Sequence, residues 1–231
     1  MKLLNSFVMK GINKARISFI SSIDVSSNNY KKVQITNLLV DKTDVFDNSI
    51  VNVKNHLIKR IMRFTEQKDV LESRLSFVDR TKKLETINFD IPLKILKIKN
   101  KIYYLTEQNK SISEMRIIYM YKCYEIKIMQ LIGVAYPGEY RWNFDIKKID
   151  DFLAKHGIYL YSIKGSAEFE ELRLVNNHIK HNSNLAKLNE INEFKSNKVI
   201  EPHSLDIFLE RVKTKVNNFF IDLANNAIEK L

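Results

Sequence analysis

The chain has 231 residues, enough for one sizeable core or two small ones, and 45% of them are apolar, which excludes a disordered or fibrous protein. Lys and Arg exceed Asp and Glu by 38 to 27, and this net charge of +11 suits a polyanionic partner such as nucleic acid or, equally, a lysine-rich solvated surface. The single cysteine excludes a disulfide framework and fits a reducing, cytoplasmic location. No window approaches the roughly 18 apolar residues of a membrane span, so we expect no membrane partner.

Turn-forming residues are scarce, with five Gly and three Pro in the whole chain, and this scarcity favours long helices over strand-rich or nucleotide-cradling folds. From residue 45 to residue 78, apolar residues recur every three or four positions in two consecutive runs, which is the period of an amphipathic helix. These residues are Ile50, Val53, Leu57, Ile61, Phe64, Val70, Leu71, Leu75 and Val78.

The segment FDIPLKILKIKNKIYYL, residues 89–105, is the one exception to the helical pattern. Its β-branched residues nearly alternate with polar ones, which favours a small β-hairpin insertion, although a short helix also fits. Its basic residues either follow a phosphate backbone or are solvated on an exposed edge. They are Lys94, Lys97, Lys99 and Lys101.

The remaining segments again predict helices. Residues 111–135 form a long apolar segment with a few charged interruptions, typical of a central helix. Asp145 can cap a short helix that ends near Lys155, and Ser166 can cap the next one. A final amphipathic helix follows Pro202. Without linkers or internal repeats, the chain is expected to be a single all-α domain, residues 1–231.

The stretch ELRLVNNHIKHN, residues 171–182, concentrates arginine, asparagine and histidine on a predicted helix. At about 100° per residue, the helix places Arg173, Asn177 and His181 in a polar line along the edge of its core face. His178 falls on the side opposite the core. The residues expected on the core face are Phe169, Leu172, Val175, Asn176 and Ile179.

These side chains suit phosphodiester chemistry without a metal. Arginine binds a phosphate through its planar fork, histidine exchanges a proton near neutral pH, and asparagine donates and accepts without titrating. An alternative is purely structural: Asn176 and Asn177 prepare a helix C-terminus, and Lys180 and His181 complement its negative dipole. The two histidines lack a carboxylate or cysteine at ligand spacing, so no metal site and no cofactor are expected.

The sequence SAEFEELRLVNNHIKHN, residues 166–182, resembles the signature helix of the HEPN superfamily of helical domains. The hallmark of that family is an arginine followed, after four to six residues, by a histidine. Arg173 and His178 match this spacing with four residues between them. In a second register, His181 is the family histidine and Asn176 stands where the family has its arginine. Both registers remain open.

The resemblance implies a HEPN-like helical bundle that acts as a metal-independent endoribonuclease, with Arg173, Asn177, His178 and His181 at its active site. Active members of the family are homodimers whose motifs face each other across a composite cleft. Many belong to toxin–antitoxin or antiphage defence systems, so RNA, a second copy and an antitoxin or defence protein are the expected partners. The basic surplus is then expected to border the motif. Other members have lost the motif, and the alternative is a non-catalytic helical module that binds RNA or a partner protein.

Overall fold

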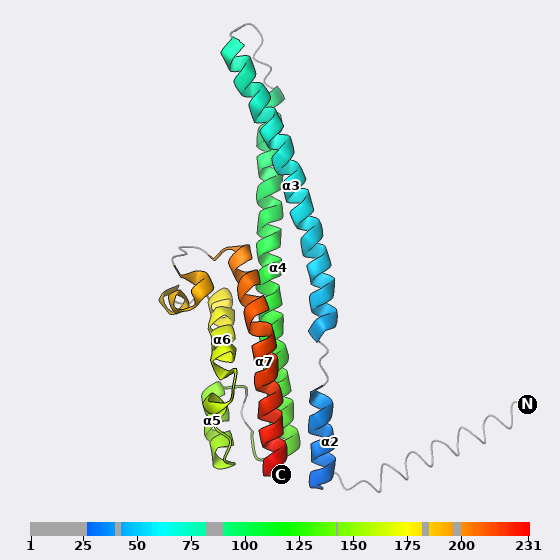
Figure 1. Ribbon diagram of the computed structural model, residues 1–231, viewed down its shortest axis with the longest axis vertical. Coiled ribbons are helices and arrows are strands. Elements are labelled where there is room, and N and C mark those ends of the chain that lie inside the picture. The colour runs from blue at the N-terminus through cyan, green and yellow to red at the C-terminus, as the bar shows by residue number, and fades with distance from the viewer. Residues whose placement is uncertain (1–26, 40–42, 82–89, 142, 182–184, 196–199) are drawn as a thin grey trace, which may run out of the picture. The chain divides into compact units, whose positions relative to one another are not determined.

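The computed structural model describes residues 27–39, 43–81, 90–141, 143–181, 185–195 and 200–231, and these residues contain helices and no strand (Figure 1). The predicted all-α fold is therefore confirmed for this part of the chain. The α-helices are α2 (Asn28–Leu38), α3 (Thr43–Thr81), α4 (Asp90–Ala135), α5 (Ile146–Lys155), α6 (Ser166–His181) and α7 (Pro202–Lys230). Three short 3-10 helices are η1 (Leu160–Ser162), η2 (Leu185–Glu190) and η3 (Asn192–Phe194).

The described residues divide into two compact units, and the single domain expected from the sequence stays a prediction. The first unit takes its residues from Met1–Asp41, Tyr124–Ser166 and Asn217–Leu231, and the second from Lys42–Cys123 and Ala167–Val216. Helices α4 and α7 each contribute to both units. All four candidate catalytic residues, from Arg173 to His181, belong to the second unit, which is therefore the one that positions the site.

The predicted β-hairpin at residues 89–105 is wrong, because residues 90–105 form the first turns of α4. Their apolar positions are separated by four, three, four and three residues, which is a helical period that the intervening lysines disguise as alternation. Pro92 is the third residue of α4, within the first turn, where its missing N–H leaves no helical hydrogen bond unmade. The apolar positions are Ile91, Ile95, Ile98, Ile102 and Leu105.

Two other predicted helix starts have different outcomes. Asp145 caps α5 as expected, since its carboxylate accepts hydrogen bonds from the backbone N–H groups of Lys147, at 3.1 Å, and Lys148, at 3.4 Å. Ser166 is instead the first residue of α6, and its hydroxyl donates to the carbonyl of Tyr161 at 3.1 Å. Gly165 precedes it with a φ of 88°, a left-handed conformation that favours glycine.

The final helix α7, predicted as amphipathic, buries seven apolar residues that recur every three or four positions. These positions follow one another at intervals of three or four residues, as on one face of a helix. Those up to Val216 belong to the second unit, and the later ones belong to the first. The buried positions are Leu205, Phe208, Val212, Val216, Phe219, Leu223 and Ala227.

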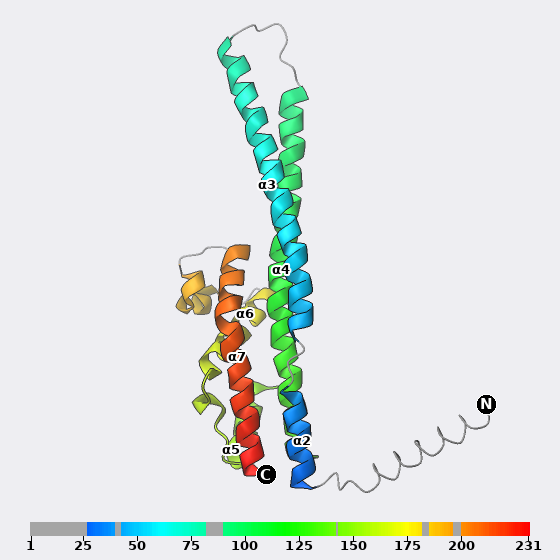
Figure 2. The ribbon, with the colours of Figure 1, turned by 45° about the vertical axis from the view of Figure 1, so that its right-hand side comes forward.

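In the second unit, a buried group of charges ties α3, α4 and α7 together. Helices α3 and α4 lie antiparallel and side by side in both views (Figures 1 and 2). Lys54 of α3 and Arg116 of α4 are 5% and 4% exposed, and both pair with the carboxylate of Asp206 on α7. The Lys54 ammonium also donates to the hydroxyl of Ser113, and Arg116 reaches Glu210 at 2.9 Å. Burial lowers the pKa of Lys54, although the hydrogen bond and charge of Asp206 oppose this effect.

Replacing Asp206 by asparagine is expected to lower the free energy of unfolding by on the order of 3 kcal/mol. The substitution removes the negative charge that lies between the buried side chains of Lys54 and Arg116. Urea unfolding followed by circular dichroism measures the change. Glu210→Gln is the matched control: its side chain is 64% exposed, so a loss below about 1 kcal/mol is expected. Equal effects of the two substitutions would contradict the role of Asp206.

Candidate functional site

Helix α6 is buried over a wider arc than its sequence predicts. Phe169, Leu172, Val175 and Asn176 face the core as expected, with exposed fractions of 2% or less. His178 is also buried, at 9%, although the sequence placed it opposite the core. The buried arc therefore covers roughly 180° of the helix at ideal geometry.

The extra burial of His178 follows from packing against two helices. On one side, the ring of Phe169 stacks on Tyr121 of α4, with 5.9 Å between centroids. On another side, Glu171 pairs with Arg211 of α7 at 2.7 Å. His178 is seven residues after Glu171, so it returns to within about 20° of the side that faces α7. A helical wheel with one core face cannot anticipate this second neighbour.

Arg173, Asn177 and His181 form the line that the spacing predicts along the other edge of α6. Arg173 and Asn177 are half-buried and His181 is exposed. Successive members are one turn apart and shifted by about 40° at ideal geometry, so all three side chains emerge on one strip of surface. We call these three residues the polar line. The structure thus separates His181, which shares this line, from His178, which does not.

The guanidinium of Arg173 is already engaged by a carboxylate. Its Nε donates to Glu170 at 2.7 Å, and a second nitrogen donates to the other oxygen of the same carboxylate. Glu170 is one turn earlier on α6, so the pair is local to the helix. A phosphate that binds the Nε side of the guanidinium would have to replace Glu170 there, and it would find the group already oriented.

Asn176 is 1% exposed and lies in the core, where its amide nitrogen donates to the side-chain oxygen of Asn177 at 3.3 Å. Its own side-chain oxygen has no hydrogen-bond partner among the described residues. In the register that makes His181 the family histidine, the family arginine falls at this position. Position 176 is buried in this structure, whereas Arg173 is only half-buried. Arg173 is therefore the arginine of α6 that can reach a ligand.

The charges that surround α6 largely neutralise one another, so the basic surplus expected beside the motif is not found in these contacts. Glu168 pairs with Lys215 at 2.7 Å, and Arg211 bridges Glu171 and Glu193. The hydrogen bond from Lys215 lowers the pKa of Glu168, and the hydrogen bonds that Arg211 donates to Glu193 and Glu171 raise the pKa of Arg211. Sequence spacing could not reveal these partners, because they come from α7 and η3.

Comparison with family models, with curated proteins and with solved structures finds no match to this chain. Of the helices that the structure describes, none is both long and apolar enough to cross a membrane. Within the same residues, His, Cys, Asp and Glu side chains do not gather in threes as metal ligands would. The site is therefore defined by the geometry of α6 and its neighbours.

The different burial of the two histidines predicts different chemical reactivity. Diethyl pyrocarbonate should modify the exposed His181 several-fold faster than the buried His178, because the reagent must reach an imidazole nitrogen. Mass spectrometry of peptides after timed exposure measures both rates in one sample. In urea-unfolded protein the two rates should converge. Faster modification of His178 in the folded protein would contradict the arrangement of α6.

Proposed function

We propose that the chain is a metal-independent endoribonuclease whose active site is the polar line of Arg173, Asn177 and His181. The observation that carries this proposal is the placement of an arginine, an amide and an exposed histidine on one accessible strip of α6. The resemblance of residues 166–182 to the HEPN signature helix supports the same chemistry. In this assignment His181 is the reactive histidine, and His178 is a buried supporting residue.

The reaction begins when the 2′-hydroxyl of a ribose attacks the adjacent phosphorus. A histidine accepts the hydroxyl proton, and the bond from phosphorus to the 5′-oxygen breaks as that oxygen gains a proton. The products are a 2′,3′-cyclic phosphate and a 5′-hydroxyl. Arg173 stabilises the charge that builds on the phosphoryl oxygens, and Asn177 orients them.

Two copies of α6 explain both proton transfers. The reaction needs a base and an acid, whereas each polar line offers one histidine. A two-fold homodimer that brings two polar lines together supplies two imidazoles and two guanidinium groups to one cleft. One His181 then acts as the base while its counterpart protonates the leaving oxygen. An antitoxin or defence protein that covers the same strip would inhibit the enzyme.

Cleavage of a labelled single-stranded RNA in EDTA tests the assignment. Arg173→Ala and His181→Ala should each reduce the rate by about 100-fold or more, because each removes a group that acts in the transition state. His178→Gln is the matched control and should retain most activity, provided that circular dichroism confirms its fold. A requirement for a divalent metal, or loss of activity only in the His178 variant, would contradict the proposed site.

Mixing wild-type protein with the inactive Arg173→Ala,His181→Ala variant tests the composite cleft. If both copies contribute, activity should fall with the square of the wild-type fraction, because mixed dimers lack half of the site. Subunits are exchanged by unfolding and refolding them together, and light scattering measures the oligomer. A linear fall in activity, or an active monomer, would show that each copy acts alone.

A second candidate function, a non-catalytic module that binds RNA or a protein, is favoured by the buried Asn176. In one register this residue replaces the family arginine, and in the other register the family histidine is the buried His178. The cleavage assay separates the candidates. Wild-type protein that binds RNA yet releases no cyclic phosphate would favour the module.

A further inference from the structure

A two-helix arm in the second unit carries charge that the candidate site does not use. We define the arm as residues 55–77 of α3 and 90–112 of α4, which run antiparallel (Figures 1 and 2). Lys99 pairs with Glu72 across the two helices at 3.0 Å, and the Lys101 ammonium lies 5.2 Å from the centre of the Phe64 ring. These contacts hold the arm together and still leave most of its cations available.

The arm is strongly basic. It contains ten Lys and Arg residues against five Asp and Glu. Two of the ten, Lys68 and Lys99, pair with Asp69 or Glu72. Besides Lys101, which lies over the Phe64 ring, six exposed cations of the arm have no carboxylate partner among the described side chains. They are Lys59, Arg60, Arg63, Arg74, Lys94 and Lys97.

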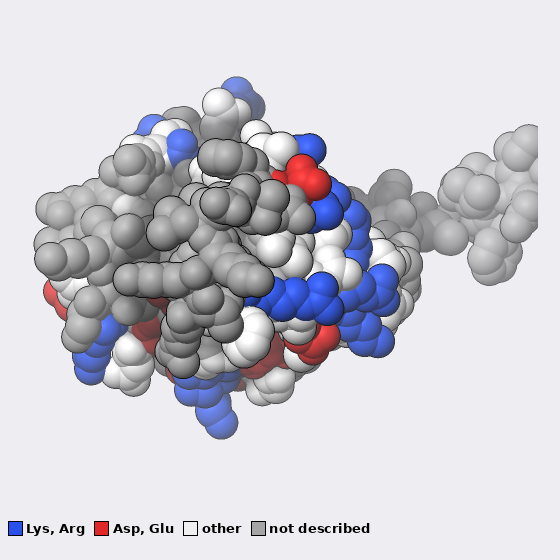
Figure 3. Space-filling model, turned by 90° about the horizontal axis from the view of Figure 1, so that it is seen from above, with Lys and Arg blue, Asp and Glu red and all other residues white. Residues whose placement is uncertain are grey.

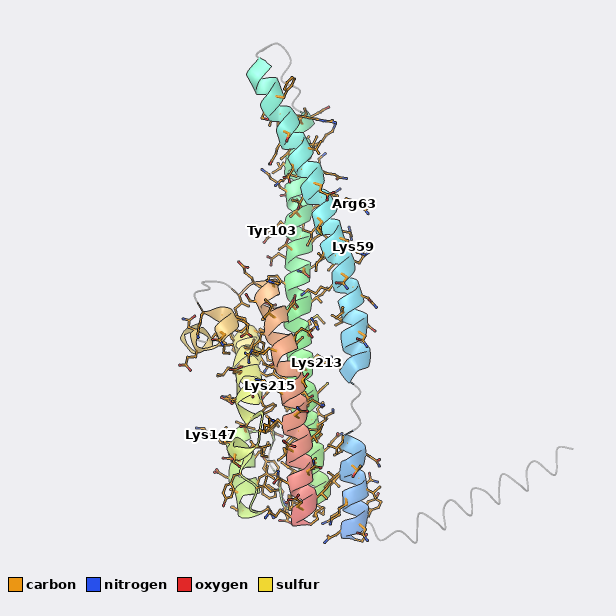
Figure 4. All side chains as sticks on the ribbon, in the orientation of Figure 1. Lys59, Arg63, Tyr103, Lys147, Lys213 and Lys215 are labelled. Atoms are coloured by element: carbon orange, nitrogen blue, oxygen red, sulfur yellow. The ribbon has the colours of Figure 1, made fainter. Side chains whose placement is uncertain are left out.

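The unpaired cations align along the helices. Lys59 and Arg63 are one turn apart on α3, and Arg74 returns to the same face three turns later, roughly 22 Å from Lys59. Figure 4 shows Lys59 and Arg63 projecting from α3 on one side of the two helices, and Tyr103 projecting from α4 on the opposite side. In the view from above, Lys and Arg cover more of the visible surface of the described residues than Asp and Glu do (Figure 3). Such a stripe of cations matches the repeating charge of a phosphate backbone.

The arm also carries exposed aromatic and apolar side chains, so an RNA strand that uses both the cations and the rings would wrap around the two helices. Tyr103 and Tyr104 are 62% and 66% exposed, and Phe77 is 69% exposed. A shallow groove of about 670 Å³ is lined by the apolar side chains of Val70, Phe77 and Ile91 together with Asp69, Ser73 and Arg74. Unpaired bases stack on such rings and apolar floors, whereas bases inside a duplex cannot reach them.

We infer that the two-helix arm is a binding surface for single-stranded RNA, with the unpaired cations of α3 and α4 on its phosphates and the exposed aromatic rings on its bases. This inference rests on the proposed function for its substrate class. It is favoured because Arg173, Arg211 and Lys215 pair with carboxylates of α6, whereas six exposed cations of the arm have no carboxylate partner among the described residues. A second copy of the arm is disfavoured as occupant, because like charges would meet.

Fluorescence anisotropy with a labelled single-stranded oligouridylate, measured in EDTA on the cleavage-deficient Arg173→Ala,His181→Ala protein, tests the arm. Lys59→Gln,Arg63→Gln,Lys97→Gln should weaken binding at least tenfold and reduce the slope of log affinity against log salt by about 2, at roughly 0.7 per phosphate contact. Tyr103→Ala,Tyr104→Ala should weaken binding with little change in that slope, because stacking releases no counterions. The matched control removes three exposed lysines of α5, namely Lys147, Lys148 and Lys155, and should bind like the parent protein.

Each outcome has a separate meaning for the arm and for the catalytic proposal. Equal RNA binding by the arm variant and the α5 control would refute the proposal that the arm binds RNA. Equal binding of polyglutamate, unaffected by the tyrosine substitutions, would also overturn it and indicate an acidic protein as partner. If the wild-type protein binds RNA through the arm and cleaves none, the RNA-binding proposal is supported and the ribonuclease proposal is refuted. If wild-type protein cleaves RNA, the arm variant on a wild-type background should show a raised KM.

Discussion

The carboxylate of Asp206 is the interaction on which the second unit depends. It lies between two buried cations, Lys54 and Arg116, and so joins α3, α4 and α7 at one level. Because buried charges tolerate little displacement, this pairing fixes the register of α7 against α4. On the opposite side of α7, Arg211 and Lys215 then reach the carboxylates of α6. The position of the candidate site therefore follows from a charge cluster that contains none of its residues.

Sequence patterns predicted the helices well and their neighbours poorly. The period of the apolar residues in α7 identified its buried face, and the aspartate before α5 identified its start. The same method misjudged α6, because burial depends on how many elements cover a helix, and the period of one segment carries no such information. Local spacing carries no signal of contacts between residues that are far apart in the sequence. Asp206 is 90 positions from Arg116 and 152 positions from Lys54.

The net charge of the chain does not reveal where its charged residues lie in the structure. A surplus of +11 suggested cations beside the motif, whereas the structure surrounds α6 with paired carboxylates and leaves unpaired cations on the arm. This separation has a physical consequence for the proposed enzyme. Contacts far from the reacting phosphate stabilise substrate and transition state alike, so they set affinity and contribute little to the chemical step. Under the proposed function, the side chains of the polar line on α6 are then the ones that must bind the transition state more tightly than the substrate.

The pair between Arg173 and Glu170 gives that discrimination a mechanism. In the ground state, a phosphodiester that binds the Nε side of the guanidinium competes with a carboxylate that already accepts hydrogen bonds from Nε and one terminal nitrogen. As the 2′-oxygen attacks, charge accumulates on the phosphoryl oxygens, and the balance shifts from Glu170 toward the phosphate. An interaction that strengthens only along the reaction path raises kcat without tightening the substrate complex. Under the proposed function, Glu170→Gln should therefore lower KM more than it raises kcat, since it removes the competitor from the ground state. Steady-state cleavage kinetics measures both constants, and a fall in kcat with unchanged KM would show that Glu170 orients Arg173 and does not compete for it.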